Sequence, residues 1–122
     1  MSKFVPPVWQ VEETSTIEEK FKLEILKNGS SIGEILLHER PNYVAGRQPD
    51  LCHIQLDHPS VSREHAAFVN STDGCIFIVD LVSAQKTFVN KTALEPNNFE
   101  RLFVGDIIRF GGMLMNYIYI FN

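Results

Sequence analysis

The feature of this sequence that most limits its fold is a series of short runs rich in β-branched and aromatic residues, separated by turn residues. The clearest run is KFKLEILK, residues 20–27, in which Phe21, Leu23 and Ile25 alternate with charged side chains before an Asn-Gly turn. The other runs are IGEILL, NYVAG, HIQL, HAAFV, CIFIVD, TFVN, DIIRF and NYIYIF. No long segment keeps the 3.6-residue apolar period of an amphipathic helix. The pattern therefore predicts an all-β chain folded as a sandwich or barrel.

The 122 residues suit a single domain, but the first 19 differ in character from the rest. They contain an apolar patch with two prolines, FVPPVW, and then an acidic stretch that starts at QVEETS. We therefore expect an N-terminal extension, residues 1–19, and one β domain, residues 20–122. Two states of the extension stay open: either Phe4, Val8 and Trp9 anchor it to the domain surface, or it is disordered.

The net charge of −4 is unevenly distributed. Residues 1–19 hold one lysine and four glutamates, a net charge of −3, so the remaining residues carry only −1. Binding to many nucleic-acid phosphates needs a basic excess, so we expect no direct contact with nucleic acid. No apolar run approaches the roughly 20 residues that span a bilayer, and the first residues lack the apolar core of a signal peptide. We therefore expect no membrane association and no secretion, with Cys52 and Cys75 present as thiols.

The stretch HPSVSREHAAF, residues 58–68, places Ser62, Arg63 and His65 beside an apolar run. One interpretation is a catalytic pair, with Ser62 as the nucleophile, His65 as its base and Asp80 as the residue that orients the base. A hydrolase serine normally lies in a strained turn such as GxSxG, and this sequence has no such motif. We therefore do not expect an enzyme.

A metal site is the second interpretation, because five histidines and cysteines lie near this stretch. They are Cys52, His53, His58, His65 and Cys75. Structural zinc sites use paired ligands two to four residues apart, whereas Cys52 and His53 are adjacent and would point to opposite faces of a strand. We therefore expect neither a metal ion nor another cofactor.

An anion-binding site is the third interpretation. Three expected loops carry groups that bind phosphate: Gly46 with Arg47, Ser62 with Arg63, and Ser83–Thr87. Loops cluster at the two ends of a sandwich, so these three can converge. A guanidinium donates two hydrogen bonds to phosphate oxygens, and a hydroxyl can occupy another lone pair. From the residues alone, a phosphate site and ordinary surface turns both stay open.

In this order, three segments resemble the forkhead-associated (FHA) domains: YVAGRQPDLCHIQLDHPSVSREHAAF, FIVDLVSAQKTFVNK and LFVGDIIRFGG. The resemblance covers about residues 20–122 and implies a β-sandwich of about eleven strands. It also implies a monomeric signalling module that binds a phosphothreonine-containing protein or peptide. The upstream PPVW and the stretch LEILKNGSSIGE are most similar to FHA domains of nuclear proteins, which implies a nuclear or nucleocytoplasmic location.

The resemblance also implies roles for single residues. Arg47 would bind the phosphate and orient the loops, and Ser62 would donate its hydroxyl to a phosphate oxygen. Arg63 would contact the phosphate or the peptide backbone. Gly46 and His65 would be structural, with His65 bracing its loop from the inside.

The third loop departs from the family pattern, Ser-x-Asn-Gly-Thr or Ser-x-His-Gly-Thr. The residues here are Ser83, Ala84, Gln85, Lys86 and Thr87, of which the first four are expected to line the peptide site. Gln85 keeps an amide for the ligand backbone, whereas Lys86 replaces a glycine and costs about 1 kcal/mol if the turn needs a positive φ. We favour a phosphothreonine-dependent interaction, because Arg47 and Ser62 are present. The alternative is a phosphate-independent interaction scaffold with a degenerate pocket.

Overall fold

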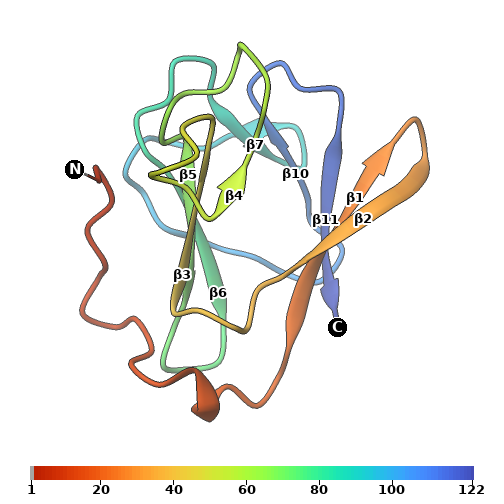
Figure 1. Ribbon diagram of the computed structural model, residues 1–122. Coiled ribbons are helices and arrows are strands. Elements are labelled where there is room, and N and C mark those ends of the chain that lie inside the picture. The colour runs from red at the N-terminus through yellow and green to blue at the C-terminus, as the bar shows by residue number, and fades with distance from the viewer. Residues whose placement is uncertain (1) are drawn as a thin grey trace.

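The computed structural model describes residues 2–122, which form two β sheets packed face to face (Figure 1). The strands are β1 Phe21–Lys27, β2 Ser30–Leu36, β3 Asn42–Gly46, β4 Ile54–Gln55, β5 Ala66–Asn70, β6 Ile76–Asp80, β7 Thr87–Val89, β8 Thr92–Ala93, β9 Glu100–Arg101, β10 Ile107–Phe110 and β11 Asn116–Phe121. One sheet has the order β2-β1-β11-β10-β7-β8, and the other has the order β4-β3-β5-β6-β9. The prediction of an all-β sandwich of about eleven strands is confirmed.

Antiparallel pairing joins all neighbouring strands except β3 and β4, which run parallel. A single 3-10 turn, η1 Thr14–Thr16, precedes β1. No helix among residues 2–122 has the length and the apolar content to cross a membrane.

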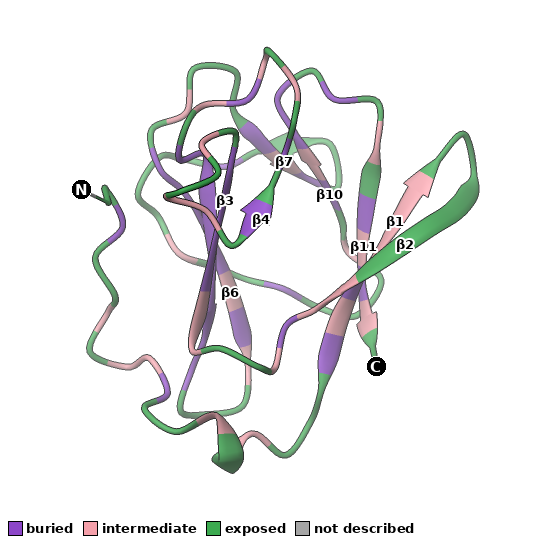
Figure 2. Cartoon of the chain, in the orientation of Figure 1, coloured by how far each residue is buried: buried purple, intermediate pink, exposed green. Residues whose placement is uncertain are grey.

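The six-stranded sheet follows the alternation seen in the sequence. Phe21 and Leu23 of β1 point into the sandwich, whereas Lys22 faces outward and pairs with Glu34. Phe21 stacks on Tyr119 of β11 with the ring centroids 4.8 Å apart. Figure 2 shows that burial is concentrated on the strands that face each other, while the β1–β2 turn is exposed. Fully burying each large apolar side chain stabilises the fold by about 1.5–3 kcal/mol, so the two inner faces hold the sheets together.

The five-stranded sheet is covered on both faces, and all five residues of β5 are buried. Its inner face packs against the six-stranded sheet, and residues 2–13 run along its outer face (Figure 1). Phe4 is 9% exposed and packs in a cluster with Val44, Val79 and Leu81. The structure thus has the extension anchored to the domain. The proposed boundary after residue 19 stays a prediction, and residue 1 lies outside the described residues.

Aromatic packing and one backbone bond hold the next part of the extension. Trp9 contacts the rings of Phe77 and Phe99, with centroid distances of 4.9 and 5.0 Å. The Val11 N–H donates to the carbonyl oxygen of Asn70 at 2.9 Å. Val8, in contrast, is fully exposed, so its expected part in anchoring is wrong. The reason is local: Trp9 faces the sheet, and Val8 before it faces solvent.

Candidate functional site

Three loops that sequence analysis singled out meet at one end of the sandwich, the upper end in Figure 1. The Arg47 N–H after β3 donates to the carbonyl oxygen of Ser62 at 3.0 Å. The Ala84 N–H after β6 donates to the Ser62 hydroxyl oxygen, also at 3.0 Å. We call this end the apex and define it as residues 46–48, 60–63, 82–87 and 111–112. Ser62 is therefore the point at which the first and third loops are joined.

Gly46 allows the first two loops to approach each other closely. A Cβ at this position would overlap the carbonyl oxygen of Arg63 and lie 2.8 Å from its carbonyl carbon. It would also lie 2.9 Å from the sulfur of Cys52, whose thiol donates to the same carbonyl oxygen. Only glycine fits without moving backbone.

Arg47 is exposed, and one nitrogen of its guanidinium is fixed by a hydrogen bond. Its Nε donates to the carbonyl oxygen of Val61 at 3.0 Å. The two terminal nitrogens of the guanidinium form no hydrogen bond within residues 2–122, so four N–H groups stay available to a ligand. Arg63 is exposed as well, and its side chain likewise has no partner in that part of the chain.

Ser62 keeps a donor for a ligand. Its hydroxyl oxygen accepts the Ala84 N–H, and the hydroxyl hydrogen has no acceptor within residues 2–122. Ser62 is half-buried and is a direct neighbour of the exposed Arg47, whose N–H it accepts at its carbonyl oxygen. The pair can donate to neighbouring oxygens of one anion.

His65 braces the apex from inside and has no exposed surface. Its Nδ1 accepts the Ser62 N–H at 3.0 Å, and its Nε2 donates to the carbonyl oxygen of Lys86 at 2.9 Å. Burial lowers the pKa of His65, which favours the neutral ring with the proton on Nε2. Both ring nitrogens are occupied by backbone groups, so His65 has no nitrogen left to act as a base toward the Ser62 hydroxyl. This geometry removes the catalytic-pair interpretation.

The third loop keeps the conformation that glycine would favour. Lys86 has a φ of 69°, in the left-handed region where a lysine costs about 1 kcal/mol. The Lys86 carbonyl oxygen accepts two hydrogen bonds, from His65 and from the Gly111 N–H at 2.8 Å. Lys86 therefore holds a strained left-handed conformation at the position where the family pattern has glycine.

Asp80, at the end of β6, ties down the start of this loop. It is buried and accepts hydrogen bonds from the Ser83 N–H at 3.0 Å, the Ser83 hydroxyl at 2.5 Å and the Thr87 hydroxyl at 2.7 Å. The Ser83 hydroxyl, expected to line the peptide site, thus points to Asp80. Ala84, Gln85 and Lys86 are exposed and present their side chains to solvent.

A fourth segment, after β10, also belongs to the apex, and sequence analysis did not assign it a role. The Gly112 N–H donates to the Ser60 hydroxyl oxygen at 2.8 Å. A Cβ on Gly111, which has a φ of 54°, would lie 2.8 Å from the Ser60 carbonyl oxygen. The Gly-Gly pair that follows DIIRF was the available signal, because paired glycines mark a turn or a close approach.

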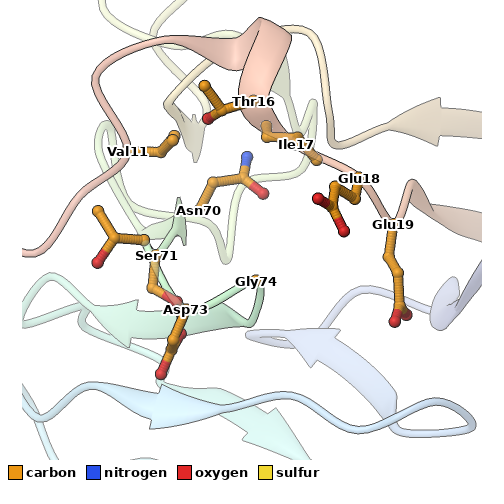
Figure 3. Close-up of a pocket in the computed structure, with 10 residues that line it drawn as sticks. Val11, Thr16, Ile17, Glu18, Glu19, Asn70, Ser71, Asp73 and Gly74 are labelled. Carbon is orange, nitrogen blue, oxygen red and sulfur yellow. Dashed lines mark hydrogen bonds between the residues drawn. The ribbon is translucent and has the colours of Figure 1, made fainter.

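A hollow at the opposite end of the sandwich has acidic walls (Figure 3). It lies between η1 and the β5–β6 turn and is lined by Glu18, Glu19 and Asp73. A hydrogen bond from the Ser71 hydroxyl lowers the pKa of Asp73, which keeps this carboxyl ionised at neutral pH. Three carboxylates repel an anion, so the apex is the better candidate for a phosphate. No group of three or more metal-binding side chains occurs in residues 2–122.

Comparison with known proteins identifies the fold family. The family model of the FHA domain matches residues 43–111, which include Gly46, the Ser62 loop, the third loop and Gly111. The chain belongs to the FHA domain family. FHA domains are interaction modules rather than enzymes.

The curated relatives are longer proteins. The Protein phosphatase 1 regulatory inhibitor subunit PPP1R8 homolog of Arabidopsis thaliana is 38% identical over 117 residues, which cover 96% of this chain and 31% of that protein. The human Nuclear inhibitor of protein phosphatase 1 is 33% identical over 96 residues, covering 78% and 27%. Human Kanadaptin is 36% identical over 102 residues, covering 75% and 14%. This FHA domain therefore spans about a third or less of each relative.

Solved structures agree with the fold. The crystal structure of full-length yeast Pml1p has a TM-score of 0.83 at 16% identity and covers 98% of this chain and 99% of that one. The solution structure of the FHA domain of TbPar42 has a TM-score of 0.77 at 26% identity, with coverages of 98% and 65%. Both alignments cover 98% of this chain and so take in most of the N-terminal extension.

Proposed function

We propose that this FHA domain is a protein interaction module that binds phosphothreonine-containing partners, with the phosphate at the apex. The observation that carries the proposal is the position of Ser62 where the first and third loops are hydrogen-bonded together, which we call the Ser62 joint. One backbone bond to His65 and one from Ala84 hold Ser62 in place, while its hydroxyl hydrogen and the terminal nitrogens of Arg47 have no partner in the described chain. A preorganised pair of donors of this kind suits a dianionic phosphate.

The residues around this pair have separate roles. Arg47 and Ser62 hydrogen-bond the phosphate, and the exposed Arg63 and Lys86 add positive charge beside it. The Gln85 amide hydrogen-bonds the ligand backbone in place of the usual Asn or His. Ala84 contributes its position in the loop, and Ser83 acts through Asp80 to hold the loop.

Two features of relatives support the ligand and the location. One solved FHA structure, 24% identical, comes from a study of phosphothreonine-dependent FHA domain interactions. Relatives named Nuclear inhibitor of protein phosphatase 1 and Smad nuclear-interacting protein 1 carry a nuclear location in their names. We therefore infer a nuclear protein partner, bound by a monomeric domain.

The expected affinity follows from the hydrogen-bond donors that meet the phosphate. A charge-assisted hydrogen bond contributes about 1.5–3 kcal/mol, so a few of them, after ordering costs, give a Kd on the order of 1–100 μM. Replacing Arg47 with alanine should weaken binding about 10- to 100-fold.

Isothermal titration of the domain with a phosphothreonine peptide library tests the proposal. Arg40→Ala is the matched control, because Arg40 is exposed and its Nε also donates to a backbone carbonyl, that of Asn42 at 3.2 Å. We expect Arg40→Ala to bind like the wild type, and phosphoserine and unphosphorylated peptides not to bind. Equal affinity of wild type and Arg47→Ala, or binding that survives phosphatase treatment, would instead indicate a phosphate-independent scaffold.

A further inference from the structure

The N-terminal extension is bound directly beside the apex by a buried carboxylate, that of Glu64. Glu64, between Arg63 and His65, is only 4% exposed. Within residues 2–122, its carboxylate hydrogen bonds come from the extension: the Lys3 N–H donates to both carboxylate oxygens at 3.0 Å, and the Ser2 hydroxyl donates to one of them at 2.5 Å. A buried carboxylate without donors is strongly unfavourable, so these contacts hold the chain at Lys3 beside the Ser62 loop.

A second anchor fixes the direction of the segment. Phe4, the next residue, packs in the cluster that contains Leu81, the residue directly after β6. The third loop leaves the sheet from this point. Lys3 is thus held between two anchors, next to the end of the second loop and the beginning of the third.

The Lys3 side chain is exposed and has no carboxylate partner, since the one ion pair within residues 2–122 joins Lys22 and Glu34. Glu64, which the Lys3 N–H binds, directly follows Arg63, so the Lys3 backbone is held one residue from the end of the Ser62 loop. The exposed Lys3 ammonium therefore adds a cation beside this loop.

We propose that Lys3 is a specificity-determining residue of the peptide site, and that the preferred ligand is a phosphothreonine peptide with acidic residues beside the phosphothreonine. The inference rests on the proposed function, because it concerns residues that flank the phosphate. Successive residues of an extended peptide advance by about 3.3 Å, so the neighbours of the phosphothreonine can pass over the loops around Lys3. An acidic side chain of the ligand at that place forms an ion pair with the Lys3 ammonium, whereas an apolar side chain forms no such pair.

Three phosphothreonine heptapeptides test the inference by isothermal titration. One carries alanine at every other position, one has glutamates before the phosphothreonine, and one has glutamates after it. The variant is Lys3→Gln, which removes the charge and keeps the backbone N–H that binds Glu64. The control is Lys20→Gln, because Lys20 is exposed just before β1, at the opposite end of the sandwich.

We expect the wild type to bind one glutamate peptide about 2- to 5-fold more tightly than the alanine peptide, the range of an exposed ion pair. Lys3→Gln should lose this preference and bind the alanine peptide like the wild type, while Lys20→Gln should keep it. A preference that survives Lys3→Gln, or that is absent in the wild type, overturns the inference. The proposed function is still supported in that case if the wild type binds the alanine phosphothreonine peptide. Failure of all three peptides to bind the wild type overturns both.

Discussion

Lys86 gives the sharpest test of how this FHA domain combines strain and function. Its φ of 69° lies where glycine is favoured, and its exposed side chain lies at the apex. Lys86→Gly therefore removes a backbone strain and a positive charge in a single step. Stability and ligand affinity should change in opposite directions.

The size of the gain in stability follows from two opposing effects. A left-handed conformation costs a non-glycine residue about 1–2 kcal/mol, whereas the extra freedom of glycine in the unfolded chain returns about 0.4–1 kcal/mol of that. The free energy of unfolding should thus rise by about 1 kcal/mol. For a domain of this size the rise corresponds to an increase in Tm of about 3–5 °C.

Urea unfolding and peptide titration measure the two effects. Gln85→Gly is the control, because Gln85 is exposed in the same loop and its φ is not positive. We expect this control to lose about 0.5–1 kcal/mol. Loss of the Lys86 charge should weaken phosphothreonine peptide binding about 2- to 5-fold, as for an exposed ion pair. A fall in the unfolding free energy of Lys86→Gly would refute the reasoning about the turn.

Three further predictions follow from the same contacts. Gly46→Ala should lower the free energy of unfolding by about 1–3 kcal/mol, since the added Cβ overlaps backbone, and it should weaken peptide binding by displacing Arg47; urea unfolding and titration measure both. Phe4→Ala should cost about 3 kcal/mol in urea unfolding, whereas Val8→Ala should stay within about 0.5 kcal/mol, because Phe4 is buried and Val8 is not. The pKa of His65 is lowered in the folded state, so the unfolded chain binds more protons and stability falls as the pH drops below about 6.5. Nitrogen chemical shifts of the His65 ring should report a mostly neutral ring protonated on Nε2 at pH 6.5, and a mostly charged ring at that pH would contradict the assignment.

Local pattern was sufficient for most strands of this fold, but it missed the two-residue exposed strands β8 and β9, which have no apolar run. Phe21 and Leu23 alternate with charged residues, and they form a strand whose apolar face lies in the core. His65 stands at the start of an apolar run, and its inward position agrees with the expected bracing role. The strand prediction depends on side-chain alternation over a few residues, which a sequence displays directly, whereas the role of His65 was implied by the family resemblance.

Contacts between residues far apart in the chain could not be predicted from the sequence. Lys3 and Glu64 are 61 positions apart, and nothing in either local pattern indicates that a backbone N–H satisfies that carboxylate. Ser83 was assigned to the peptide site by position, but its hydroxyl direction depends on Asp80 at the end of the preceding strand. Val8 and Trp9 are both apolar, and only the path of the extension over the sheet decides which of them is buried.

The measurement that tests the central claim most directly is an NMR titration of the isotope-labelled domain with a phosphothreonine peptide. The account predicts that the amide signals of Arg47, Ser62 and Ala84 shift together, because phosphate binding at the Ser62 joint changes all three hydrogen-bonded groups. The unphosphorylated peptide should leave these signals unchanged. Shifts confined to other surfaces, or equal shifts with the unphosphorylated peptide, would contradict a phosphate site at the apex.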